Sequence, residues 1–174
     1  MKIHPARFNT YLLVAALVAG IAGCQTPSKK KELSTLRVHI EVTPDGTGAN
    51  QVVPVFREQP VRININKSPF LTELHVASAQ VVESLGGYAI QIQFNRSGTW
   101  LLEQYSLANK GRRMVIFSQF GDGPDQARWL AAPLIRQGIT NGFLVFTPDA
   151  SRDEAERIVR GLNNLVAQNK QKGL

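Results

Sequence analysis

The chain has 174 residues, a formal net charge of +7 and one cysteine. This length suits one domain with its own hydrophobic core, and a lone cysteine excludes an internal disulfide as a source of stability. The positive charge is scattered, with lysines gathered near the two ends of the chain, and no nucleic-acid-binding motif accompanies it, which argues against nucleic acid as a partner.

The first 23 residues have the pattern of a secretory signal. Lys2 and Arg7 precede an uncharged run from Tyr11 to Ile21, and small residues follow. A basic start, a short apolar core and small residues at a cleavage site are the parts of such a signal. The apolar run is shorter than the roughly 20 residues that a membrane span needs. We therefore expect residues 1–23 to be removed on export.

The sequence Ile21-Ala22-Gly23-Cys24 resembles the lipobox of bacterial lipoproteins. This resemblance implies that Cys24 is lipidated with diacylglycerol and a fatty acid such as palmitate. The membrane would then be a partner through the lipid anchor, with the protein on the periplasmic or extracytoplasmic face of the cell membrane or the outer membrane. The alternative is an unmodified thiol at the end of an ordinary signal or membrane anchor. The polar, lysine-rich residues 24–35 are expected to carry the lipid and to form a flexible tether.

Alternation of apolar and polar residues, together with short apolar runs, predicts the strands of the domain. Leu36 to Val42 alternates in this way and places His39 on the polar side, as a surface residue. A short turn is expected at 69–73. Further strands are predicted at 51–57, 61–65, 76–84, 88–94, 113–117, 129–135 and 143–146.

Two helices are predicted. The first begins after an N-cap at Ser97 and stops at Gly111, and its apolar stripe is expected to comprise Leu101, Tyr105 and Ala108, joined by Trp100 or Leu102. The second begins with a capping box of Ser151 and Glu154. Its apolar stripe is Ala155, Ile158, Val159, Leu162, Leu165 and Val166. Asp153–Arg157 and Glu156–Arg160 are spaced as ion pairs on its exposed side.

Strands outnumber helices, so we predict an α+β fold: a mainly antiparallel sheet with two helices packed on one face. The N-terminal strands occupy residues 36–75, a second region occupies 76–168, and a basic tail follows at 169–174.

No residue pattern indicates catalysis or metal binding. The only thiol is assigned to the anchor, and neither a Gly-x-Ser-x-Gly elbow nor a Walker-type loop occurs. His39 and His75 lack further ligands at metal spacing, and Asp122 and Asp125 lack the remaining ligands of an EF-hand loop. We therefore expect a protein that is not an enzyme, with no catalytic residue, no cofactor, no metal site and no small-molecule ligand.

From Val76 onward, the order of elements resembles the head subdomain of the first periplasmic region of SecD, in the SecDF protein-export family. The residues that carry this resemblance are Phe94, Gly98, Gly111, Arg112, Asp122, Gly123, Ala132, Pro133, Ile139, Gly142, Phe146 and Ala155. The resemblance implies a SecD head-like α+β region at 76–168 that contacts exported polypeptides. It does not imply the proton-coupled motor of SecD, because that work depends on transmembrane helices and the sequence after Cys24 contains no candidate span.

Three hypotheses of function follow. The first is a protein-binding module for exported or envelope proteins, which would add an extended polypeptide to a sheet edge near Val52–Phe56 or Trp129–Ile135. The second is a structural envelope lipoprotein or an accessory subunit of an assembly. The third is an enzyme, which requires a pocket with convergent polar groups.

Overall fold

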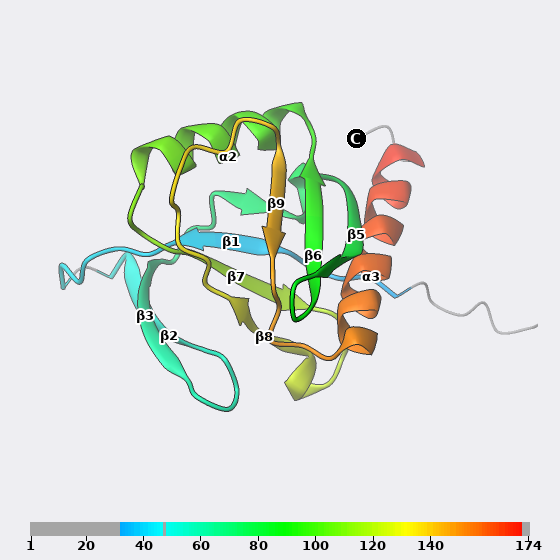
Figure 1. Ribbon diagram of the computed structural model, residues 1–174, viewed down its shortest axis with the longest axis horizontal. Helices are drawn as coiled ribbons and strands as arrows, with labels where there is room; N and C mark the ends of the chain where they lie inside the picture. Colours follow the sequence, from blue (N-terminus) through cyan, green and yellow to red (C-terminus); the bar gives the residue numbers. More distant parts are fainter. Residues whose placement is uncertain (1–31, 47, 172–174) are drawn as a thin grey trace, which may run out of the picture. The chain divides into compact units, whose positions relative to one another are not determined.

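The computed structural model describes residues 32–46 and 48–171 (Figure 1). The predicted signal and the lipidation site at Cys24 lie outside these residues. In chain order, the elements are β1 (Arg37–Ile40), β2 (Asn50–Val55), β3 (Val61–Asn66), β4 (Leu71–Thr72), a 3-10 turn (Glu73–His75), β5 (Val76–Ser84), β6 (Gly87–Phe94), α2 (Arg96–Ala108), β7 (Met114–Gln119), a second 3-10 turn (Pro124–Gln126), β8 (Ala127–Ala131), β9 (Phe143–Phe146) and α3 (Arg152–Gln171).

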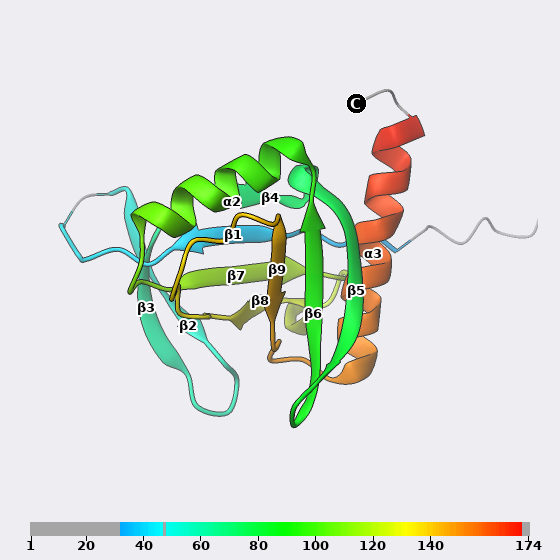
Figure 2. The same cartoon turned by 45° about the horizontal axis from the view of Figure 1, so that its top comes forward.

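The strands form three antiparallel sheets within the described chain. One has the order β4-β1-β7-β8, one is the hairpin β2-β3, and one has the order β5-β6-β9. Figure 2 shows the strands of the four-stranded sheet running across those of the three-stranded sheet, with α2 along one end of both and α3 beside β5. The α+β class and the antiparallel pairing are thus confirmed, with the strands divided among several sheets.

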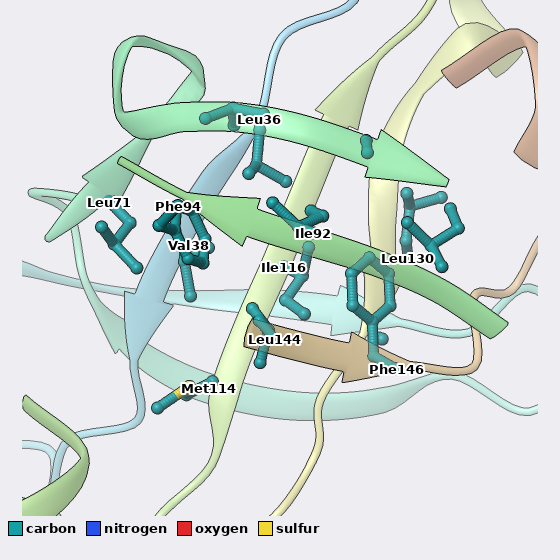
Figure 3. Packing of buried hydrophobic residues seen from close by; sticks show 14 of the residues in the cluster. Leu36, Val38, Leu71, Ile92, Phe94, Met114, Ile116, Leu130, Leu144 and Phe146 are labelled. Carbon is teal, nitrogen blue, oxygen red and sulfur yellow. The ribbon is translucent and has the colours of Figure 1, made fainter. Parts of the chain in front are cut away.

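The main core lies between the two larger sheets (Figure 3). Val38 and Ile116 project into it from the four-stranded sheet, while Ile92, Phe94 and Leu144 project from the three-stranded sheet, and each is at most 4% exposed. The alternation that predicts the strands is therefore the alternation between this core and the opposite face of each sheet.

A second, smaller core lies on the opposite face of the four-stranded sheet. There the hairpin β2-β3 packs its apolar side chains against Val115 of β7 and against Ala132. As a result β1 is covered on both faces, and His39 is only 4% exposed. The prediction of a surface histidine is wrong, because the covering hairpin comes from a different part of the sequence.

Helix α2 begins two positions earlier than predicted. Its N-cap is Asn95, whose side-chain oxygen accepts the N–H of Gly98 at 2.9 Å, and Ser97 donates its hydroxyl to the same oxygen. The predicted stripe is wrong in part, because Tyr105 and Ala108 are exposed. The buried line consists of Gly98, Leu102 and Ser106.

Helix α3 starts as predicted. Ser151 donates its N–H to Glu154, and the N–H of Glu154 reaches the Ser151 hydroxyl at 3.2 Å, which confirms the capping box. Ala155, Ile158 and Leu162 are buried. The predicted ion pairs along the helix are replaced, because Arg157 and Arg160 both bind Glu32, and Arg152 binds Glu83 and Glu156.

Strand β8 ends earlier than the predicted segment 129–135. It stops at Ala131, just before Ala132-Pro133, since proline cannot donate to a strand ladder. The carbonyl of Pro133 instead accepts the N–H of Met114 at 3.0 Å. The short strand β4 falls in the segment that was predicted to be a turn.

Candidate functional site

An open groove of about 490 Å³ lies where β8 and β9 end beside the tip of the β2-β3 hairpin. We call it the edge groove. Its walls are mostly apolar, and it takes residues from three separate parts of the sequence. These residues are Phe56, Ala131, Ala132, Pro133, Phe146, Thr147, Pro148 and Asp149.

The edge groove brings two strand edges together. β8 is the last strand of the four-stranded sheet, and β9 is the last strand of the three-stranded sheet. The main-chain N–H of Asp149 donates to the carbonyl of Leu130 at 2.7 Å, so the segment after β9 is held against the outer edge of β8. This segment covers the outer edge of β8 at Leu130, so an extended chain lying in the groove would run beside the backbone of β9.

Among the residues that the structure describes, the outer edge of β9 has main-chain groups at Val145 without a strand partner. The N–H of Phe94 donates to Gly142, which fixes the alternation of the β6-β9 ladder and pairs Leu144 and Phe146 with β6. The N–H and C=O of Val145 therefore point away from β6, and the Val145 side chain is 49% exposed. Such an edge is a template for another strand.

Phe56 forms one wall of the edge groove in an unusual backbone conformation. Its φ is +73°, and the described residues contain no other non-glycine residue at positive φ. A side chain in this left-handed region costs roughly 1–2 kcal/mol. Phe56 stays 39% exposed, so a large aromatic residue is partly open to solvent at this strained position. Backbone strain of this kind clusters at functional sites.

Ion pairs hold the hairpin tip in place. The N–H of Arg57 donates to the Asp149 carboxylate at 2.7 Å, and the Arg57 guanidinium lies 3.4 Å from the same carboxylate. This fixes Phe56 relative to the ends of β8 and β9. Arg57 also approaches Glu154, at 3.8 Å.

Glu154, in the first turn of α3, pairs with Arg57 and Arg128 next to the groove. It accepts a hydrogen bond from Arg128 at 2.7 Å and one from the main chain of Ser151 at 2.8 Å. Partial burial would raise the pKa of Glu154, but these hydrogen bonds outweigh burial and lower the pKa below its ordinary value of 4.5. Glu154 is therefore a carboxylate at neutral pH, paired with a cation and unsuited to general acid chemistry.

The structure brings together the two edge segments named from the sequence. Phe56 ends the first of them, Val52–Phe56, and Ala131–Pro133 belong to the second, Trp129–Ile135; both line the edge groove. Sequence reasoning missed Val145 and the segment Phe146–Asp149. The only available signal was Thr147-Pro148-Asp149, a break between a strand and a helix.

The histidines considered as candidate ligands, His39 and His75, do not line the edge groove. His39 is buried beneath the hairpin, and His75 caps a 3-10 turn with a hydrogen bond from the N–H of Thr72. Within residues 32–46 and 48–171, no three His, Cys, Asp or Glu side chains are grouped as metal ligands. In the same part of the chain, no helix is long and apolar enough to cross a membrane.

Comparison with known proteins identifies the family. The model of the SecDF P1 head subdomain matches residues 29–164, so the chain belongs to this family. The match begins before β1 and therefore includes the N-terminal strands as well as the region after Val76.

Two solved structures share the fold. One is described as a membrane component, SecDF, that enhances protein export; it is 19% identical, with a TM-score of 0.53, and the match covers 92% of this chain and 69% of that one. The other is SecDF in a super-membrane-facing form, 20% identical with a TM-score of 0.53; the match covers 92% of this chain and 21% of that one. This chain thus corresponds to about a fifth of the second structure. Among curated protein sequences, nothing matches.

Proposed function

We propose that this protein is a membrane-anchored, extracytoplasmic protein-binding module linked to protein export. In this proposal the edge groove holds extended segments of exported or envelope proteins, and the free main chain of Val145 adds them as a strand beside β9. The module binds and does not catalyse. The observation that carries the proposal is the unpaired edge of β9 next to an apolar groove.

Membership of the SecDF P1 head family supports the link to export. Family membership alone does not transfer an activity, so the proposal rests on the groove of this chain. The apolar lining suits side chains of many sequences, while main-chain hydrogen bonds are independent of sequence. This combination is suited to polypeptides that are bound before they fold.

Photo-crosslinking tests the groove. A photoreactive benzoylphenylalanine in place of Val145 should capture an extended, non-folding polypeptide, whereas the same group in place of Leu85 should not. Leu85 is a matched control because it is a fully exposed apolar residue on the β5-β6 hairpin, away from the groove. Equal capture at both positions, or none at Val145, would count against the proposal.

The role of Phe56 is tested with a substitution that keeps its turn. Asn tolerates positive φ, so Phe56→Asn removes the aromatic wall without adding backbone strain. We expect crosslinking at Val145 to fall several-fold. Val52→Asn is the control, because Val52 is 59% exposed on the same hairpin and does not line the groove. Equal losses in the two variants would mean that the groove is not the binding site.

The anchor is tested separately. Labelling with a radioactive fatty acid should mark the wild-type protein and not Cys24→Ala; equal labelling would exclude Cys24 as the lipidation site. Recovery of one folded, stoichiometric partner from cells, with no crosslinks to extended chains, would favour the structural or accessory-subunit alternative.

A further inference from the structure

A second groove, of about 300 Å³, lies on the face of the four-stranded sheet that the β2-β3 hairpin leaves partly uncovered. We call it the basic groove. Its lining residues are Arg37, His39, Gln51, Lys67, Phe117 and Trp129. It is separate from the edge groove, and no residue lines both.

The floor of the basic groove is a row of residues in register across three strands. Arg37 of β1 is paired with Phe117 of β7, which is paired with Trp129 of β8. These three side chains therefore project from the same face of the sheet, side by side. The hairpin covers the next row, which contains His39 and Val115, and leaves this row partly open, with Trp129 packed against the edge of the hairpin core.

The aromatic rings of the floor contact one another. The rings of Phe117 and Trp129 meet edge to face, with centroids 5.2 Å apart, and His39 meets Trp129 in the same manner at 5.2 Å. Phe117 and Trp129 are both half-buried and line the groove. A partly open aromatic surface of this kind favours a planar or apolar group of a ligand.

The charge in the basic groove is positive and is not neutralised within the described chain. No acidic residue lines it. Residues 32–46 and 48–171 place no carboxylate within ion-pair distance of Arg37, whereas Arg57, Arg128, Arg152, Arg157 and Arg160 are all paired. Lys67 donates to the carbonyl of Gly48, at 2.6 Å, and has no ion pair with a carboxylate among residues 32–46 and 48–171, so its charge also remains available.

We propose that the basic groove binds a carboxylate carried next to an aromatic group on an extended polypeptide. Arg37 offers a planar fork of donors that matches a carboxylate, Lys67 adds a second positive charge, and Phe117 with Trp129 receives the aromatic group. This proposal rests on the proposed function and names the chemistry of the segment that is bound. The carboxylate comes either from the C-terminus of the polypeptide or from an acidic side chain.

The two grooves lie at opposite ends of β2. Gln51 lines the basic groove and Phe56 lines the edge groove. Gln51 and Phe56 are five residue steps apart along extended chain, which is about 17 Å. An extended segment of roughly the same number of residues reaches from one groove to the other. The basic groove would then select acidic, aromatic-containing segments among those that the edge groove holds through their main chain.

Fluorescence of Trp129 measures binding in the basic groove directly. Trp100→Phe removes the other tryptophan, which is 61% exposed on α2 and is remote from the groove lining. In this background, N-acetylphenylalanine should change the emission of Trp129 in a saturable manner. The uncharged N-acetylphenylalaninamide should bind at least 5-fold more weakly. The peptide acetyl-Phe-Glu-amide distinguishes the two possible sources of the carboxylate. If it binds as tightly as N-acetylphenylalanine, the groove accepts a side-chain carboxylate; if it binds more weakly, the groove prefers the C-terminal carboxylate.

Arg37→Gln should weaken N-acetylphenylalanine binding by about 5-fold to 10-fold without changing the thermal unfolding midpoint, because Arg37 is exposed. Arg96→Gln is the matched control, since it also removes an exposed arginine without an ion-pair partner in the described chain and should leave affinity unchanged.

No saturable change, equal affinity for acid and amide, or equal effects of the two variants would overturn the proposal. If only these measurements fail while crosslinking at Val145 succeeds, the proposed function stands without this selectivity. If these succeed and crosslinking fails, the groove is real and the proposed function is wrong.

Discussion

Asn163 on α3 hydrogen-bonds both main-chain groups of Ala79 on β5. Its amide oxygen accepts the Ala79 N–H at 2.9 Å, and its amide nitrogen donates to the Ala79 carbonyl at 2.9 Å. The Asn163 side chain thus occupies the main-chain groups of Ala79 that a neighbouring strand would otherwise bind, at the outer edge of β5. At the opposite edge of the same sheet, the main chain of Val145 has no such partner in the described chain. The sheet is therefore protected on one side and open on the side of the edge groove.

Asn163→Ala removes both hydrogen bonds at Ala79. We expect the free energy of unfolding to fall by about 1–2 kcal/mol, because each net hydrogen bond contributes about 1 kcal/mol and water partly replaces it at this exposed position. Urea denaturation measures the change, and hydrogen exchange should show faster exchange at the Ala79 amide.

Asn164→Ala is the control for Asn163. Asn164 makes one hydrogen bond, from its amide nitrogen to the Glu32 carbonyl at 2.9 Å, so its loss should cost less and leave the Ala79 amide unaffected. If the two variants were equally stable and exchanged equally at Ala79, Asn163 would have no role in closing β5.

Gly98 is a position where alanine should destabilise a helix. A Cβ on Gly98 would lie 2.8 Å from the Cβ of His75 and 3.0 Å from the His75 carbonyl oxygen. In an exposed helix, glycine to alanine stabilises by up to about 1 kcal/mol, but overpacking costs about 1–3 kcal/mol. Gly98→Ala should therefore lower the free energy of unfolding, as measured by urea denaturation. Ser97→Ala, one residue away on the exposed side, should have a much smaller effect. A stabilised Gly98→Ala would show that α2 moves away from the 3-10 turn at no cost.

The sequence predicts elements whose own residues determine them. Helix α3 carries its capping box and its buried stripe within one segment, so Ser151, Glu154 and Leu162 were placed correctly. Strands β5 and β9 were predicted with the observed bounds, because the apolar runs that indicate them lie within single segments.

Features that depend on contacts between distant segments were missed. His39 alternates like a surface residue, and only the hairpin β2-β3 buries it. Arg157 and Arg160 are spaced for pairs within α3 but bind Glu32 instead. The edge groove combines Phe56, Pro133 and Phe146, and no spacing in the sequence relates these three positions. The sequence indicated Val52–Phe56 and Trp129–Ile135 as separate candidate edges. That both line one groove could be seen only in the folded structure.

The ion pair between Arg128 and Glu154 should make an acid-sensitive contribution to stability. Arg128 is 12% exposed at its side chain and also donates to the carbonyls of Asp149 and Asp125. Glu154→Gln leaves this buried cation without its carboxylate. We expect the free energy of unfolding to fall by about 1.5–3 kcal/mol at pH 7, which is the range for hydrogen bonds to charged groups.

The pH dependence of this difference follows from the lowered pKa of Glu154. A carboxyl whose pKa is lower in the folded state stabilises the fold above its unfolded pKa, near 4.5, and loses this contribution as pH falls through the folded pKa. The difference in free energy of unfolding between the wild type and Glu154→Gln should therefore be largest at pH 6–7 and should become smaller below pH 4.5. A gap that stays constant down to pH 3 would mean that the charge of Glu154 does not stabilise the fold.

His39 should make the protein less stable in mild acid, in a pH range separate from that of Glu154. Burial lowers the pKa of His39 below 6.5, while its hydrogen bond with the carbonyl of Asn66, at 2.8 Å, acts in the opposite direction. The unfolded chain therefore takes up the proton at a higher pH than the folded chain. The contribution of neutral His39 to stability is therefore fully present above about pH 6.5. Below this pH the free energy of unfolding falls, by at most 1.36 kcal/mol per pH unit for one proton.

His39→Phe removes this proton uptake while retaining an aromatic ring against Trp129, which His39 contacts at 5.2 Å between centroids. The variant should lose some stability at pH 7.5, because the Asn66 carbonyl loses its partner. Between pH 7.5 and pH 5.5, however, its free energy of unfolding should decline less steeply than that of the wild type. Urea denaturation at intervals of half a pH unit measures the two slopes. Parallel slopes would show that His39 takes up its proton equally in the folded and unfolded states, so that burial beneath the hairpin does not disfavour its charged form.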